Sequence, residues 1–174
     1  MIKRICPFVL VLTFLFTYSI SMLAADSLKE GMKAPDFTLE DAFGNSYTLS
    51  NYKGKAPVVI YFYPKAGTAG CTKEACGIRD GLQSFKANGI KVFGISVDSS
   101  EAIDKFISDN NLDFPLLSDA NKKVTSDYGV LGDNGKAKRF TFIINKKGNI
   151  AKIIEVKNIS THADEVLEIA SQLK

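Results

Sequence analysis

The sequence contains few of the histidine and cysteine side chains that usually bind zinc. Its 174 residues include a single histidine, His162, and three cysteines, of which Cys71 and Cys76 lie close together. A structural zinc site usually takes four such ligands, so two thiols without a nearby histidine leave the ligand set incomplete. We therefore expect no bound metal, and no motif in the chain indicates another cofactor.

Internal repeats, linkers and low-complexity segments are also absent from the sequence. With 45% hydrophobic and 24% charged residues, the composition argues against a disordered or collagen-like chain. The length suits one well-buried domain and is short for two. No basic stripe interleaved with aromatic residues is present, so we expect no nucleic-acid partner.

The first 25 residues differ in composition from the rest. A basic start at Met1–Arg4, an apolar run at Pro7–Phe16 and a small-residue exit at Leu23–Ala25 are typical of a secretory signal peptide. We predict a signal peptide over residues 1–25 and an exported mature domain over residues 26–174. If the source is a bacterium, we expect this domain in the periplasm. The alternative is an uncleaved anchor, because the stretch approaches the ~20 residues that span a bilayer. Cleavage is favoured, since threonines and serines interrupt the run, and it would leave no stable membrane association.

Removing this signal would change both the charge and the thiol content of the chain. Lys3 and Arg4 would be lost from the 22 basic residues, which leaves 20 basic against 19 acidic side chains and a net charge of +1. Cys6 would be lost as well. Cys71 and Cys76 would then be the two thiols of an exported protein, in a compartment where disulfides can form.

Strands and helices alternate along the mature part of the chain. Val58–Tyr63 is an unbroken β-branched and aromatic run, typical of a central strand that is covered on both faces. Cys71–Asn88 carries apolar residues at helical spacing, and Lys91–Val97 returns to strand, which makes a βαβ unit. The remaining predicted elements are an N-terminal hairpin of Phe37–Leu39 and Tyr47–Leu49, a helix at Ser99–Asn111 with Asp98 as N-cap, a strand at Phe114–Leu117, a helix at Asn121–Tyr128, strands at Arg139–Asn145 and Asn149–Val156, and a helix from Ser160 or Thr161 to Leu173.

This order of elements predicts an α/β protein with a thioredoxin-like fold. It would have a central mixed β-sheet flanked by helices and an N-terminal β-hairpin. In such sheets, sites lie beyond the carboxyl ends of the strands, where the N-termini of helices point. Cys71 lies at such a place in the sequence.

Cys71 is expected in the first turn of its helix. Unpaired N–H groups and the helix dipole favour the thiolate there, whereas an ordinary thiol with a pKa of about 8.5 is mostly protonated at neutral pH. The alternative is a buried cysteine that acts as a small apolar residue. We consider this weaker, because the glycine-rich loop at Gly67–Gly70 is a poor wall for a buried thiol.

The spacing between Cys71 and Cys76 is unsuited to a static disulfide. On an ideal helix, residues five apart have Cα atoms about 8.6 Å from each other, whereas a disulfide needs less than about 7 Å. If the two cysteines pair, the start of the helix must unwind, and Gly77 and Gly81 would make it easier to open. Two alternatives, a thioredoxin-type thiol–disulfide oxidoreductase and a copper-delivery module, usually carry cysteines at closer spacing.

The activating charge near Cys71 cannot be identified from periodicity. His162 is expected at the start of the last helix, and we favour an exposed helix-end residue over a catalytic base. Arg139 opens a predicted strand and is the preferred cation, with a surface ion pair as its alternative role.

The residues around Cys71 resemble those of peroxiredoxins of the AhpC/TSA-like kind, in particular the bacterioferritin comigratory or Q-type (atypical 2-Cys) group. Pro64–Cys71 matches the family pattern P-x-x-x-T-x-x-C, and Cys71–Asp80 resembles that group's helix with a second cysteine five residues on. The similarity covers most of the mature chain, with further matches at Gly31–Phe37, Gly94–Ser96, Leu116–Asp119 and Arg139.

This resemblance implies a role for each matching residue. Cys71 would be the peroxidatic cysteine, which becomes a sulfenic acid, and Cys76 would resolve it as an intramolecular disulfide. Thr68 would bond the peroxide and the attacking sulfur, Pro64 would shield the thiolate, and Arg139 would stabilise developing charge. The alternatives are a Thr68 hydroxyl that bonds its own backbone and a Pro64 that only ends a strand.

The resemblance also implies partners. The protein would reduce hydrogen peroxide and organic hydroperoxides in antioxidant defence, and a thioredoxin-like protein or a small thiol would reduce it again, with the chain as a monomer or weak homodimer. Two departures from the family pattern affect substrate breadth and oligomer contacts. Ala69 stands where many relatives have proline, and the segment 129–139 is shorter than in better-known enzymes.

Overall fold

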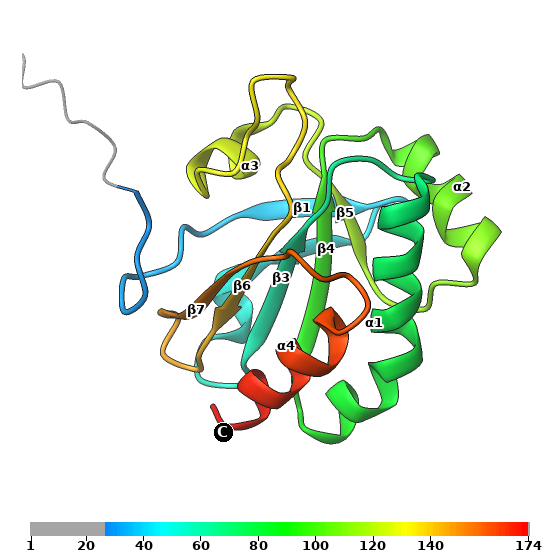
Figure 1. Cartoon of the computed structure of the whole chain (residues 1–174). Coiled ribbons are helices and arrows are strands. Elements are labelled where there is room, and N and C mark those ends of the chain that lie inside the picture. The colour runs from blue at the N-terminus through cyan, green and yellow to red at the C-terminus, as the bar shows by residue number, and fades with distance from the viewer. Residues whose placement is uncertain (1–26, 174) are drawn as a thin grey trace, which may run out of the picture.

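A seven-stranded mixed sheet forms the centre of the structure, a computed structural model that describes residues 27–173 (Figure 1). The strands lie in the order β2-β1-β5-β4-β3-β6-β7. The elements are β1 (Thr38–Asp41), β2 (Ser46–Thr48), the 3₁₀ helix η1 (Leu49–Tyr52), β3 (Val58–Phe62), α1 (Ala69–Ala87), β4 (Lys91–Ser96), α2 (Ser100–Asn110), β5 (Leu116–Ser118), α3 (Lys123–Asp127), β6 (Phe140–Ile144), β7 (Ile150–Glu155) and α4 (His162–Ser171). The predicted signal peptide over residues 1–25 lies outside the described residues and stays a prediction.

Strand β3 occupies a central position in the sheet, as its apolar sequence predicts. It pairs in parallel with β4 and antiparallel with β6, and all five of its residues are buried. Because side chains alternate along a strand, Val59 and Tyr61 belong to one core, and Ile60 and Phe62 belong to the core on the other face. Both faces of the sheet are therefore covered.

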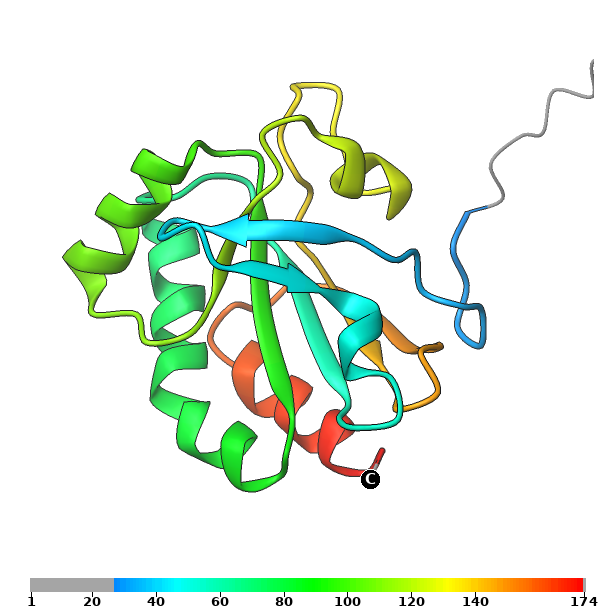
Figure 2. The same ribbon diagram turned by 180° about the vertical axis from the view of Figure 1, so that it is seen from behind.

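Helices α1 and α4 lie side by side over one face of the sheet, in front of it in Figure 1. Helix α2 contributes Ile103 and Phe106 to the same core. The view from behind in Figure 2 shows the β1–β2 hairpin and η1 on the opposite side. There, Val124 of α3 and Tyr128 join the second core. This arrangement confirms the predicted thioredoxin-like mixed sheet with flanking helices and an N-terminal hairpin.

The differences from the predicted elements lie at their ends, apart from η1, which was not predicted. Asp98 does not cap α2. Ser99 does, because its side chain accepts a hydrogen bond from the N–H of Ala102. Helix α1 begins at Ala69, two residues before the predicted start, with Thr68 as its N-cap residue. Local composition marks an approximate boundary, while the cap that forms depends on which side chain the folded backbone orients toward the free N–H groups.

The described residues include neither a membrane-spanning helix nor a cluster of metal-binding side chains. Among residues 27–173, no helix is both long enough and apolar enough to cross a membrane. The same residues contain no group of three or more histidine, cysteine, aspartate or glutamate side chains that could hold a metal ion.

Candidate active site

Cys71 lies in the first turn of α1, directly after the loop that follows β3. The backbone N–H of Thr72 already donates to the carbonyl of Thr68, so the helix is formed around the thiol. The Cys71 side chain is buried, with 1% exposure, and packs in the core shared by α1 and α4. The expectation that the glycine-rich loop leaves this thiol unburied is therefore wrong.

The cover over Cys71 comes from other segments of the chain, which the local sequence could not show. A Cβ added at Gly70 would lie 3.4 Å from Cδ1 of Ile159 and 3.5 Å from Nη2 of Arg139. The missing side chain at Gly70 thus leaves space that these two residues occupy. A sulfur buried under an arginine differs from one buried in an apolar core, because the positively charged guanidinium lies next to it.

Arg139 reaches the sulfur directly. Its Nη2 donates to Sγ of Cys71 at 3.2 Å, and its Nη1 donates to Oε2 of Glu74. Burial acts to lower the pKa of Arg139, but Glu74 and Cys71 together raise it above the ordinary value of an arginine. The guanidinium is therefore a fixed positive charge between a sulfur and a carboxyl group.

Thr68 and Pro64 lie in the loop before the helix. The hydroxyl of Thr68 is exposed and donates to the carbonyl of Lys65 at 3.0 Å, so the bond to its own backbone that was considered as an alternative does form. With its hydrogen used in this way, the Thr68 oxygen can still accept a hydrogen bond from an incoming hydroxyl group. Pro64 is half-buried at the end of β3 and lines a hollow of about 450 Å³ beside residues 132–138.

Asp98 holds this loop in place. Its Oδ2 accepts a hydrogen bond from the N–H of Ala66 at 2.7 Å and another from the hydroxyl of Ser96 at 2.9 Å. The carbonyl of Asp98 accepts from the hydroxyl of Ser118. The carboxylate that the sequence assigned to a helix cap instead connects the active-site loop to the end of β4, and the backbone carbonyl of the same residue connects to β5.

Cys76 lies further along the same helix and is partly exposed, and neither it nor Cys71 is in a disulfide. Because α1 is continuous from Ala69 to Ala87, the two Cα atoms keep the separation of about 8.6 Å that an ideal helix gives. The two thiols share an element without being within bonding reach of each other.

Glu74 is a site residue that the sequence reasoning missed. Its side chain is 0% exposed, and burial raises its pKa to about 7 although Arg139 acts to lower it. A sequence signal did exist, since Glu74 falls on the apolar stripe of α1 with Cys71 and Ile78. A lone acid on a buried helical face needs a buried partner.

His162 is buried at 1% exposure, so the prediction of an exposed helix-end residue is wrong. Its Nε2 lies 2.8 Å from Oγ1 of Thr141, and its Nδ1 lies 3.2 Å from Oε1 of Glu74, although poorly aligned for a hydrogen bond. Burial, helped by the charge of Arg139, lowers its pKa to about 4, so the ring is neutral at pH 7. The reason is tertiary: α4 packs its first turn over α1, and this turns the ring inward.

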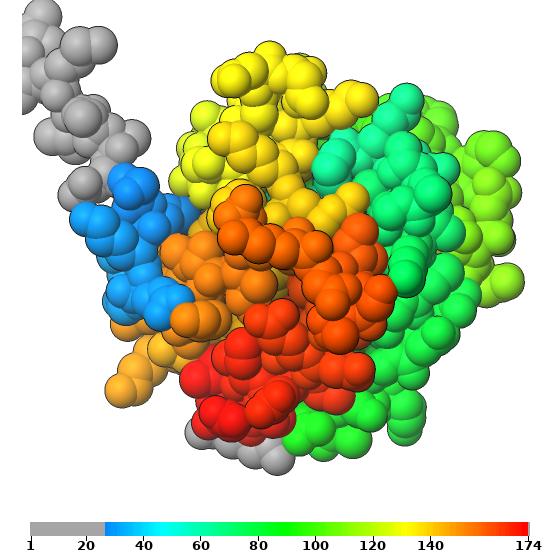
Figure 3. All heavy atoms as spheres, in the orientation of Figure 1, coloured from blue at the N-terminus to red at the C-terminus, as the bar shows by residue number. Residues whose placement is uncertain are grey.

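The segment 129–139 forms one wall of the hollow beside Pro64. Residues 132–135 form a tight turn within this short segment, and an isolated bridge pairs Leu131 with Ala137. In Figure 3 the yellow surface of this segment meets the teal surface around the end of β3. Of the predicted site residues in the described part of the chain, Pro64 lines this hollow, and Cys71, Thr68 and Arg139 do not.

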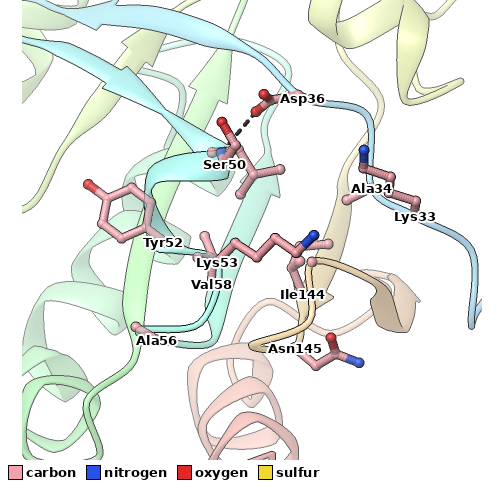
Figure 4. Close-up of a pocket in the computed structure, with 12 residues that line it drawn as sticks. Lys33, Ala34, Asp36, Ser50, Tyr52, Lys53, Ala56, Val58, Ile144 and Asn145 are labelled. Atoms are coloured by element: carbon pink, nitrogen blue, oxygen red, sulfur yellow. Dashed lines mark hydrogen bonds between the residues drawn. The ribbon is translucent and has the colours of Figure 1, made fainter.

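A second pocket, of about 140 Å³, lies at the opposite end of β3 (Figure 4). Its walls include Lys33, Asp36, Tyr52 and Lys53, with no cysteine or histidine. It offers no thiol to a substrate, so the redox chemistry belongs to the Cys71 end of the sheet.

Comparison with known proteins identifies the family. Residues 31–153 match the AhpC/TSA family. Peroxiredoxin Bcp of Escherichia coli is 40% identical over 147 residues, which cover 80% of this chain and 94% of that protein. The crystal structure of peroxidoxin BcpB from Mycobacterium tuberculosis superposes with a TM-score of 0.78 at 36% identity, covering 84% of this chain and 99% of that one.

A further structural relative is the bacterioferritin comigratory protein of Xanthomonas campestris, a structure studied for alkyl peroxide reduction activity. It is similar with a TM-score of 0.76 and 28% identity, covering 84% of this chain and 100% of that one. The protein therefore belongs to the AhpC/TSA family and, within it, to the Bcp or Q-type peroxiredoxins, which are thiol-dependent peroxidases.

Proposed function

We propose that Cys71 is the sulfur that attacks the peroxide. The Cys71 thiolate displaces alkoxide from the terminal oxygen of R–O–O–H, which gives Cys71–S–OH and RO⁻, and the alkoxide takes up a proton to leave as ROH. Sulfur is oxidised by two electrons and the O–O bond is reduced. The observation that carries this assignment is the 3.2 Å contact from Arg139 to the sulfur of a cysteine in the first turn of a helix.

The neighbouring side chains support this step in different ways. Arg139 is placed to stabilise both the thiolate and the charge that develops on the peroxide oxygens. Thr68, whose hydrogen goes to Lys65, is placed to accept a hydrogen bond from the peroxide hydroxyl and so to orient it. Pro64 limits the access of water between the hollow and the sulfur.

Cys76 resolves the sulfenic acid. Its thiol attacks Cys71–S–OH, which forms the disulfide and releases water. This requires the first turns of α1 to unwind, because the helical separation of the two cysteines exceeds what a disulfide spans. The active site must therefore open once in every catalytic cycle.

Substrate and reductant follow from the chemistry of the site and from the relatives. The open hollow beside Pro64 and the alkyl peroxide reduction studied for the Xanthomonas protein support organic hydroperoxides besides hydrogen peroxide. A thioredoxin-like dithiol or a small thiol then reduces the disulfide, in antioxidant defence. We further propose that the protein is exported to the bacterial periplasm after loss of residues 1–25, and works there as a monomer or weak homodimer.

Peroxide consumption by variants tests these assignments. Cys71→Ser should abolish turnover, whereas Cys76→Ser should reduce one equivalent of peroxide and then stop as a sulfenic acid until an added thiol rescues it. Mass spectrometry of the oxidised Cys76→Ser protein identifies that species. Undiminished turnover by Cys71→Ser would contradict the assignment of the attacking sulfur.

A further inference from the structure

Glu74 lies on α1 between the two cysteines, in the segment that must unwind for Cys71 to meet Cys76. Unwinding this segment therefore removes Glu74 from its present surroundings. In the helical state the carboxyl is 0% exposed, and after unwinding it enters water. A buried carboxyl and an exposed one differ in how readily they hold a proton.

The buried carboxyl of Glu74 has too few charged partners to stabilise its ionised form. Within residues 27–173, its one cationic neighbour is Arg139, which also contacts the sulfur of Cys71, so two potential anions share one positive charge. The other oxygen of Glu74, Oε1, faces Nδ1 of His162, yet neither atom has a hydrogen-bond partner within the described part of the chain. A buried carboxylate in this position is therefore only half compensated.

The remaining groups around Glu74 do not supply the missing charge. His162 is held neutral by burial and by Arg139, and the hydroxyls of Tyr61 and Tyr63 are buried with no partner in the described residues. Burial raises the pKa of both tyrosines, so they stay neutral as well. The cluster in the reduced protein therefore comprises the sulfur of Cys71, one guanidinium and a carboxyl that is better accommodated with its proton.

We infer that Glu74 is the proton store of the peroxidase cycle: it keeps a proton while α1 is folded over the Cys71 thiolate and gives that proton up when the cycle opens the helix. This inference rests on the proposed roles of Cys71 and Cys76. The balance is Cys71–S⁻ + Cys76–SH + Glu74–COOH + ROOH → Cys71–S–S–Cys76 + Glu74–COO⁻ + ROH + H₂O. The proton that the leaving alkoxide needs is thus matched by one from the protein.

The sign of the pH effect follows from the two states of this carboxyl. Its pKa is about 7 in the folded site against a reference value of 4.5 in water. A raised pKa favours the folded helix at low pH, and this preference is lost as the pH rises from about 4.5 to about 7. Opening of α1 should become easier over that range, by at most about tenfold per pH unit. His162 acts in the opposite sense below about pH 6.5, but it belongs to α4, outside the segment that unwinds.

Proton counting during oxidation tests the inference without reliance on rates. The reduced full-length protein, at pH 6 in weak buffer with a pH indicator, receives one equivalent of hydrogen peroxide and no reductant. Without a proton store, formation of one disulfide from a thiolate and a thiol takes up one proton. Glu74→Gln keeps the size of the side chain and cannot hold the proton, so it should take up about one proton more per disulfide than the unmodified protein.

Glu168→Gln is the matched control, since it makes the same change on the exposed side of α4. It should take up as many protons as the unmodified protein. Equal proton uptake by Glu74→Gln and the unmodified protein, with the disulfide formed in both, would overturn the inference. Absence of a Cys71–Cys76 disulfide in a peptide map would instead contradict the proposed function, so the two failures are distinguishable.

Discussion

At the scale of single residues, the site is organised around one guanidinium. Arg139 contacts the sulfur of Cys71 with one nitrogen and the carboxyl of Glu74 with the other. Hydrogen bonds that involve a charged donor are shorter and stronger than neutral ones, and they gain strength where water is excluded. Because Glu74 fixes the direction of the guanidinium, the sulfur meets a donor that is already oriented.

Arg139→Met tests this contribution. Methionine keeps much of the apolar stem and removes both donors, so we expect the second-order rate of Cys71 oxidation to fall by about 10²-fold, the usual cost of one charge-stabilising donor. Stopped-flow kinetics with a single equivalent of peroxide measures this step. Lys147→Met, in the exposed turn between β6 and β7 and away from the hollow, is the control and should react at the unmodified rate.

The residues of this site were only partly accessible from sequence. Cys71, Cys76, Thr68, Pro64 and Arg139 were predicted from their match to the family pattern, and the structure brings Arg139 into contact with the sulfur of Cys71. His162 was misjudged, since its burial depends on how α4 docks on α1, and no local pattern encodes that contact. Burial of a helix-end side chain is decided by tertiary packing, which composition does not record.

At the scale of elements, α1 combines two demands that conflict. It is helical where it places Cys71 under Arg139, and in the proposed cycle its start unwinds so that Cys76 can reach the sulfur. Gly77 serves the second demand. A Cβ added there would lie 3.8 Å from Cβ of Ala163, which is ordinary contact, so packing alone does not require glycine at this position.

Gly77→Ala should therefore stabilise the helix and slow the formation of the disulfide. Alanine favours the helix by about 1 kcal/mol over glycine, which corresponds to about fivefold slower opening. Quenched-flow alkylation of the free thiols measures the disulfide step. Gly81→Ala makes the same change one turn further on, farther from the segment between the cysteines, and should slow that step less than Gly77→Ala does.

Strand β4 contains a glycine with the opposite property. A Cβ added at Gly94 would lie 2.7 Å from Oη of Tyr61 and 2.5 Å from Cδ2 of Leu116, closer than real side chains approach. Gly94→Ala should destabilise the fold by about 1–3 kcal/mol through overpacking. Urea denaturation measures this, and an unchanged midpoint would show that the Tyr61 ring moves aside at little cost.

The elements themselves were well predicted because their signals are long. The apolar run of β3, the stripe of α1 and the turn at residues 146–148 each extend over several residues that agree. Asp98 was misassigned because the two roles of a carboxylate after a strand, capping a helix and bonding a distant loop, look the same in sequence. Only the folded loop at Ala66 distinguishes them.

At the scale of the whole molecule, the sheet separates the chemistry from the rest of the protein. The core shared by α1 and α4 holds Cys71 and Tyr61. The core on the opposite face contains no cysteine among its described residues, and its Phe62 and Phe142 rings have centroids 5.9 Å apart. The site lies where β3 ends and α1 begins, as expected for a sheet with parallel central strands.

Export can be tested on the intact chain. Expressed with its own N-terminus in a Gram-negative host, the protein should appear in the periplasmic fraction with a mass that lacks residues 1–25, because the basic start, apolar run and small-residue exit match a cleavable signal. A full-length mass in the membrane fraction would instead support the anchor. Sedimentation of the processed protein would then determine whether it is a monomer or a weak dimer.

The account depends most on the claim that one sulfur is oxidised in a folded helix and joined to its partner only after that helix opens. Hydrogen exchange of the reduced and peroxide-oxidised protein, with a peptide map of the same samples, tests this most directly. We predict a Cys71–Cys76 disulfide together with loss of backbone protection over the start of α1, while the later turns of α1 and strand β3 stay protected. A disulfide that forms with the start of α1 fully protected, or oxidised protein without that disulfide, would contradict it.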